Sequence, residues 1–217
     1  MNEINFFKVK DKYSSLTHFI GFLLSLMATP ILLIRAAIHQ ADIRILVTLA
    51  VFMATMVLLY GASTTYHSFR LAREKELLLK RIDHISIFYF ISGSYTPLCL
   101  GIFYPESKYL GIGIWILAII GTIFKMCWVT CPKWVSSILY LGMGWISVLL
   151  VPMMLVKFGI GGFFWLLLGG IFYSVGAYLY ASKRPIGTKE FGNHEIFHVL
   201  VMLGSLCHYL LMFFFVA

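Results

Sequence analysis

Long apolar runs, each about 20 residues and almost free of charge, recur along the whole 217-residue chain. A helix of about 20 apolar residues spans the roughly 30 Å hydrocarbon core of a bilayer. Only 12% of the residues are charged, whereas soluble domains carry about 25% charged residues. Since 60% of the residues are hydrophobic, the composition excludes a disordered chain and an ordinary soluble domain, and it predicts an integral membrane protein.

Seven of these runs are bounded by charged residues, Gly or Pro and are long enough to span a bilayer. They cover approximately Leu16–Ala37, Ile45–Ser68, Ile85–Ile102, Tyr109–Met126, Val135–Val156, Gly162–Ala181 and Ile196–Val216. A membrane β-barrel would instead show segments of about 10 residues that alternate apolar and polar. We therefore predict an all-α fold, in which a single transmembrane domain of seven helices at 16–217 follows a short N-terminal segment at 1–15.

The Lys and Arg residues indicate the orientation of this bundle, because short cytoplasmic segments are enriched in them. If the N-terminus is cytoplasmic, 13 of the 17 lie in cytoplasmic segments, and the other four are Arg35, Arg44, Lys108 and Lys157. We therefore expect a cytoplasmic N-terminus and a C-terminus outside. The formal net charge of +8 comes from residues in short gaps between apolar runs, so we expect no nucleic-acid partner.

An HExxH sequence, from His194 through Glu195 to His198, begins the last apolar run. Residues four apart lie on one helix face, about 6 Å apart along the axis, so both imidazoles can bind one metal ion. The alternative is a pair of interfacial histidines without a ligand. The four cysteines contain no CxxC pair, so neither a disulfide framework nor a zinc ribbon is indicated.

The predicted orientation brings further polar residues to the leaflet that contains this motif. The second run ends near His67, the third begins near Asp83, and Ser63 lies one turn before His67. Each could have a separate structural role, but ionisable residues at membrane depth usually mark a functional site. Three imidazoles and a water molecule are the ligand set of a catalytic zinc ion, so the histidines predict a Zn²⁺ cofactor. Asp83 and Glu195 are both candidates for the general base.

Three other histidines carry weaker expectations. His208 is 14 residues beyond His194, about 21 Å along the helix axis, so it cannot share the metal. We expect it to line the same cavity nearer the outer leaflet, with a hydrogen bond to a neighbouring helix as the alternative. His18 is expected beside the site, and His84 is expected to point away from Asp83, because adjacent helical residues do not face each other.

The order and spacing of these motifs resemble those of the hemolysin III family. The resemblance rests on Ser63-x-x-x-His67, on Asp83 sixteen residues later, on the stretch from Ser92 to Pro97, and on the HExxH sequence. That family is related to the progestin and adipoQ receptors and resembles the alkaline ceramidases. The resemblance implies seven helices with a cytoplasmic N-terminus, in a multi-pass protein of a bacterial plasma membrane. It also implies zinc bound by His67, His194 and His198, with Asp83 and Ser63 near the metal-bound water. Adiponectin-receptor relatives carry Gln where Glu195 stands, so the resemblance favours Asp83 as the base.

The predicted function is hydrolysis of a lipid amide or ester by a zinc-bound water molecule within the membrane, with a membrane lipid as substrate. A non-enzymatic alternative is a sensor, transporter or regulator that contains structural zinc. The family name suggests a third alternative, a cytolytic protein. The sequence leaves the substrate and the oligomeric state undetermined.

Overall fold

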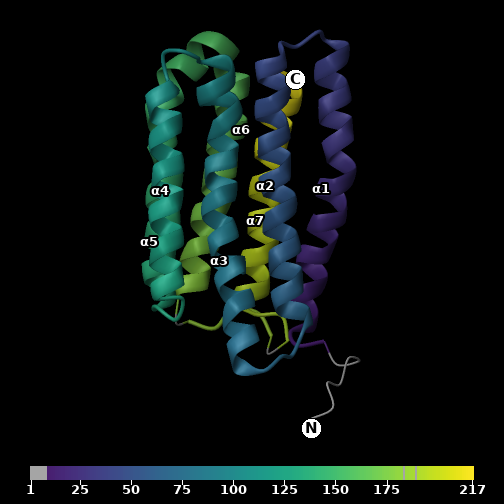
Figure 1. The fold of residues 1–217 in the computed structure, drawn as a ribbon, viewed down its shortest axis with the longest axis vertical. Coiled ribbons are helices and arrows are strands. Elements are labelled where there is room, and N and C mark those ends of the chain that lie inside the picture. The colour runs from purple at the N-terminus through teal and green to yellow at the C-terminus, as the bar shows by residue number, and fades with distance from the viewer. Residues whose placement is uncertain (1–8, 183, 189) are drawn as a thin grey trace.

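The computed structural model describes residues 9–182, 184–188 and 190–217, and these residues form helices and connecting loops without any strand. The elements in chain order are α1 (Lys12–Ile38), α2 (Ile43–Ser68), α3 (Arg73–Thr96), the π-helical turn η1 (Pro97–Ile102), α4 (Lys108–Cys127), α5 (Lys133–Trp145), the 3₁₀-helical turn η2 (Ile146–Leu150), α6 (Val151–Ala181) and α7 (Asn193–Phe215). The helices lie side by side along the long axis of the molecule (Figure 1). The prediction of an all-α bundle is confirmed.

Six continuous helical elements in the described ranges are long and apolar enough to cross a membrane, whereas the sequence predicted seven. The difference arises at Lys133–Ala181, which runs without interruption for 49 residues. As a straight helix it would be about 74 Å long, more than twice the hydrocarbon thickness of a bilayer. The two runs expected at Val135–Val156 and Gly162–Ala181 therefore belong to one element.

This long element folds back on itself. Gly159 has φ 62° and ψ −162°, a backbone conformation that breaks the helix inside α6 and that glycine adopts without a side-chain clash. The hydroxyl of Ser137 donates to the carbonyl of Ala177, 3.2 Å away, although 40 residues separate them. The indole of Trp145 donates to the hydroxyl of Ser174 at 3.0 Å. The residues before and after Gly159 are therefore antiparallel neighbours.

Other boundaries differ from the sequence prediction by a few residues, except at α3. This helix begins at Arg73 instead of Ile85, because its charged first turns continue the helix beyond the apolar run. α1 begins at Lys12, so the last residues of the expected segment 1–15 are helical, while residues 1–8 lie outside the described ranges.

α7 packs against α6 and α1, and α2 packs against α1 and α3. In Figure 1, α7 runs behind α2 through the middle of the bundle. The packed centre contains large buried side chains such as Phe52, Met53, Leu211 and Met212. The last turn of α2 and the first turn of α7 lie at the same end as the beginning of α1. This arrangement brings together the histidines that the sequence analysis selected.

Candidate metal centre

Three histidine side chains converge where α2 ends and α7 begins. The Nε2 atoms of His67 and His194 lie 3.2 Å apart. One ring nitrogen from each of His67, His194 and His198 lies within 4.8 Å of the others. His67 and His198 are buried, and His194 is partly exposed. The four-residue spacing on α7 therefore presents two imidazoles on one face, and α2 adds the third.

The donor set fits a metal ion. Zinc binds imidazole nitrogen at about 2.0–2.1 Å, so two nitrogens of a tetrahedral site lie about 3.3 Å apart. The His67–His194 separation is close to this value. Nitrogens within 4.8 Å of one another can converge on one ion through small side-chain rotations. The group is therefore compatible with a shared metal ion.

In His67 and His198, Nδ1 contacts an oxygen outside the histidine group, so Nε2 is the nitrogen that faces the other histidines. His67 Nδ1 lies 2.9 Å from Asp11 Oδ2. His198 Nδ1 lies 3.2 Å from the carbonyl oxygen of Ser14 and 3.3 Å from the hydroxyl of Thr17. An Nδ1–H that donates to these oxygens leaves the Nε2 lone pair free. The three oxygens come from Asp11, directly before α1, and from the first two turns of α1.

His18, also from α1, lies next to the three histidines. Its ring stacks on that of His198, with centroids 3.6 Å apart, and its edge meets Tyr60. The side chain is buried, and neither ring nitrogen has a hydrogen-bond partner among the described residues. His18 therefore lies against the histidine group on the side of α1.

Asp83 and Ser63 line one cavity together with His194, His198 and His18. Both side chains are buried, Asp83 on α3 and Ser63 on α2. The prediction that His84 points away from Asp83 was wrong. His84 Nδ1 lies 2.9 Å from the carbonyl oxygen of Lys80 and 3.4 Å from Asp83 Oδ2. The ring turns back along its own helix to reach that carbonyl, and this rotation brings it beside the carboxylate.

Glu195 has structural partners and is absent from the described lining of this cavity. One carboxylate oxygen accepts a bond from the backbone N–H of Gly192 at 3.0 Å, and the other accepts one from the hydroxyl of Ser14. Glu195 therefore caps the first turn of α7 and links it to α1. Its role as a base stays a prediction.

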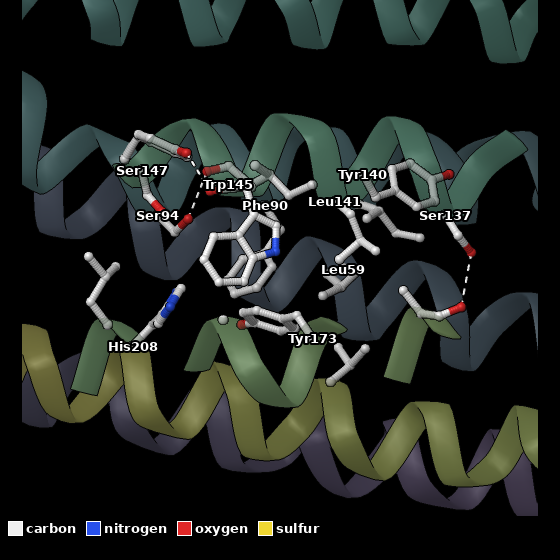
Figure 2. A pocket seen from close by; sticks show the side chains of 18 of the residues that line it. Leu59, Phe90, Ser94, Ser137, Tyr140, Leu141, Trp145, Ser147, Tyr173 and His208 are labelled. Carbon is white, nitrogen blue, oxygen red and sulfur yellow. Dashed lines mark hydrogen bonds between the residues drawn. The ribbon is translucent and has the colours of Figure 1, made fainter. Parts of the chain in front are cut away.

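The cavity extends from the histidines far into the bundle and has a volume of about 310 Å³. On α7 it follows one helix face from His194 to Met212, about 27 Å along the axis. His208 is among the lining residues and packs edge-on against Tyr173. Figure 2 shows part of the lining, where Trp145, Phe90 and Tyr173 lie between His208 and the end containing Ser137. Away from the end that contains Asp83 and the histidines, most of the side chains that line the cavity are apolar.

Comparison with known proteins matches the "Haemolysin-III related" family profile over residues 6–209. The chain belongs to the haemolysin-III family. It is 37% identical to the "Hemolysin-3 homolog" of Bacillus subtilis over 92% of this chain and 91% of the other, and 34% identical to "Hemolysin-3" of Bacillus cereus over 100% and 96%. A more distant relative is "Progestin and adipoQ receptor-like protein 1" of Caenorhabditis elegans, 26% identical over 75% of this chain and 42% of the other.

Membership of the haemolysin-III family and the apolar helices together establish a multi-pass membrane protein.

The sequence did not reveal Asp11, Ser14 and Thr17, whose oxygens contact the histidine rings or Glu195. A usable signal was present, because these polar residues cluster at the start of the first apolar run, at the end of the bundle that holds the motif. Their contacts join residues more than 50 positions apart, so spacing alone could not pair them.

Proposed function

We propose that this haemolysin-III protein is a membrane-embedded, zinc-dependent hydrolase that cleaves an amide or ester bond of a lipid. The observation that carries the proposal is the group of three histidine nitrogens within 4.8 Å of one another, beside an elongated and largely apolar cavity. His67, His194 and His198 would hold the ion. Zinc bound by three imidazoles would supply Lewis-acid activation of a water molecule and of the lipid carbonyl.

Asp83 would act as the general base. Its buried carboxylate lines the cavity at the end where the histidines lie, whereas both oxygens of Glu195 already accept hydrogen bonds. A base must reach the proton that it accepts, and Asp83 meets this requirement better. Ser63, which lines the same cavity, would donate a hydrogen bond to the reacting oxygen.

The rest of the cavity would bind the apolar chain of the lipid. A chain lying along the α7 face from Val201 to Met212 would contact apolar side chains and exclude water from the reacting bond. His208 lies on this face, too far along the axis from His194 to contact the same ion. It would instead contact the bound chain.

We also propose that the bundle crosses the membrane seven times, with the histidine group in the cytoplasmic leaflet. The fold-back at Gly159 supports two crossings within Lys133–Ala181, and the distribution of Lys and Arg supports a cytoplasmic N-terminus. Cys127 is exposed at the end of α4 that is near the histidines, whereas Cys99, Cys131 and Cys207 are buried. A membrane-impermeant maleimide should therefore label Cys127 in inverted vesicles only. Labelling in right-side-out vesicles only would reverse the orientation.

Release of fatty acid from defined lipids tests the hydrolase directly. Purified protein in liposomes would be supplied with an N-acyl sphingoid base or with an acyl ester, and the free fatty acid would be measured. We expect turnover by the wild type, loss of turnover in His198→Ala, and unchanged turnover in His39→Ala, a control at an exposed histidine beyond α1. Turnover that persists without His67, His194 or His198 would contradict the proposal.

The names of the two Bacillus relatives suggest a cytolytic activity as a second candidate. Dye release from liposomes by the purified protein, at doses that cause no lipid hydrolysis, would favour that function over the hydrolase.

A further inference from the structure

Asp11 is joined to His67 through both its backbone and its side chain. The backbone N–H of Asp11 donates to the carbonyl oxygen of His67 at 2.9 Å. Oδ2 of the same residue lies 2.9 Å from His67 Nδ1. The two contacts connect the beginning of α1 to the last turn of α2, 56 residues further along the chain. One edge of the His67 ring, the edge with Nδ1, therefore faces Asp11.

The carboxylate of Asp11 is not used as a helix cap, although Asp11 is the residue directly before α1. An Asp at this position commonly accepts a hydrogen bond from a backbone N–H of the first turn. Asp42, directly before α2, does so and accepts from Arg44 N at 2.7 Å. The side chain of Asp11 makes no such bond. Its hydrogen-bonding capacity is directed to His67 instead.

Neighbouring contacts hold Asp11 in this position. The backbone N–H of Lys10 donates to the carbonyl oxygen of Ser68 at 3.2 Å, and its ammonium group lies 2.8 Å from a carboxylate oxygen of Glu76 on α3. The same ammonium group lies 3.6 Å from the centre of the Tyr66 ring. Burial lowers the pKa of Lys10, but Glu76 and Tyr66 outweigh this effect and raise it above its ordinary value. The segment before α1 is thus fixed to α2 and α3.

We propose that Asp11 is a positioning residue for the metal centre, which keeps a proton on His67 Nδ1 and directs the Nε2 lone pair toward the shared ion. This inference rests on the proposed metal site. His67 Nε2 already faces His194 Nε2 at 3.2 Å. A carboxylate that accepts a hydrogen bond from a ligating imidazole fixes its tautomer and orientation and makes it a stronger ligand.

Zinc affinity of the purified full-length chain, measured by chelator competition, tests this role. Asp11→Asn keeps the size of the side chain and an oxygen acceptor but removes the negative charge. Asp42→Asn is a matched control at the corresponding position before α2. We expect Asp11→Asn to raise the Kd for zinc about 10- to 100-fold, with the same stoichiometry at saturation, and Asp42→Asn to leave the Kd unchanged. The visible absorption spectrum of the Co²⁺-loaded protein should change in Asp11→Asn only.

A wild-type Kd in a folded Asp11→Asn variant would overturn the inference and leave the proposed metal site intact. Absence of zinc binding in the folded wild type would overturn the metal site itself, and the two failures are therefore distinguishable. If Asp11→Asn does not fold, Asp11→Glu provides the second variant. Its longer side chain displaces the carboxylate, so an unchanged Kd in Asp11→Glu would also overturn the inference.

Discussion

The ring of His18 lies flat on the ring of His198, with the centroids 3.6 Å apart and the planes inclined by 10°. His18 comes from α1 and His198 from α7, so this stack joins the first and last helices of the bundle. It also limits rotation of one of the three proposed metal ligands.

Two substitutions of His18 distinguish the contribution of its stacked ring to stability from the contribution of its polar nitrogens. His18→Ala leaves a void against His198, and we expect it to lower the free energy of unfolding by about 2–4 kcal/mol. His18→Phe keeps an aromatic ring and removes two nitrogens that lack partners among the described residues, so its effect should stay within about 1.5 kcal/mol. Thermal unfolding in detergent measures both. Equal losses in the two variants would show that the stack contributes nothing.

Exchanging each carboxylate for its amide identifies the base. We expect Asp83→Asn to lower lipid hydrolysis at least about 100-fold, because general-base catalysis contributes roughly that much or more, while bound zinc stays unchanged. Glu195→Gln keeps an oxygen acceptor for the N–H of Gly192, so its activity should stay within a few-fold of wild type. Fatty-acid release and metal content would be measured on the same samples. The reverse order of activities would assign the base to Glu195.

A close approach between α2 and α3 depends on Gly93. A Cβ atom at this position would overlap the hydroxyl oxygen of Thr55 and lie 2.9 Å from its Cβ, so in Gly93→Ala either the Thr55 side chain or the two helices must shift. We expect a loss of about 1–3 kcal/mol in the free energy of unfolding. Gly113→Ala is the matched control, because a Cβ there has no neighbour within 4 Å and alanine favours a helix. A Gly93→Ala variant as stable as this control would contradict the packing.

Lys125 is a fully buried lysine at the end of α4, and its ammonium nitrogen lies 2.6 Å from the hydroxyl of Ser136 and 3.2 Å from the sulfur of Cys131. Lys125→Met preserves most of the volume, and Ser136 and Cys131 stay within 3.3 Å of each other. We expect little change in stability, because a buried charge contributes weakly once its desolvation is included. Lys125→Ala leaves a cavity and should cost about 2–4 kcal/mol. Equal destabilisation in both variants, measured by thermal unfolding, would contradict this reasoning.

The sequence predicted the helical membrane bundle, because hydropathy and length depend only on local composition. It also selected His67, His194 and His198, since a four-residue spacing defines a helix face and helix direction defines which end of the bundle each residue occupies. The sequence predicted two separate helices here, because Lys157 and the glycines that follow it interrupt the apolar pattern, whereas the structure has one continuous element, Lys133–Ala181, that reverses direction at Gly159.

The contacts of α1 with the histidine rings could not be predicted in the same way. Asp11 sits among lysines, and its position in the sequence indicates a helix cap or a solvated residue. The packing of α1 beside α2 and α7 brings the carboxylate of Asp11 to His67 and the carbonyl of Ser14 to His198. These contacts depend on how each helix is rotated about its own axis. A run that is apolar on all sides does not indicate that rotation.

The central claim is that three histidines bind one zinc ion, and metal content of the purified protein tests it most directly. Mass spectrometric elemental analysis would compare the wild type with His67→Ala and with the control His39→Ala. We expect about one zinc per chain in the wild type and the control, and loss of zinc in a folded His67→Ala variant. A folded wild type that contains no metal, even after zinc is supplied, would contradict the claim.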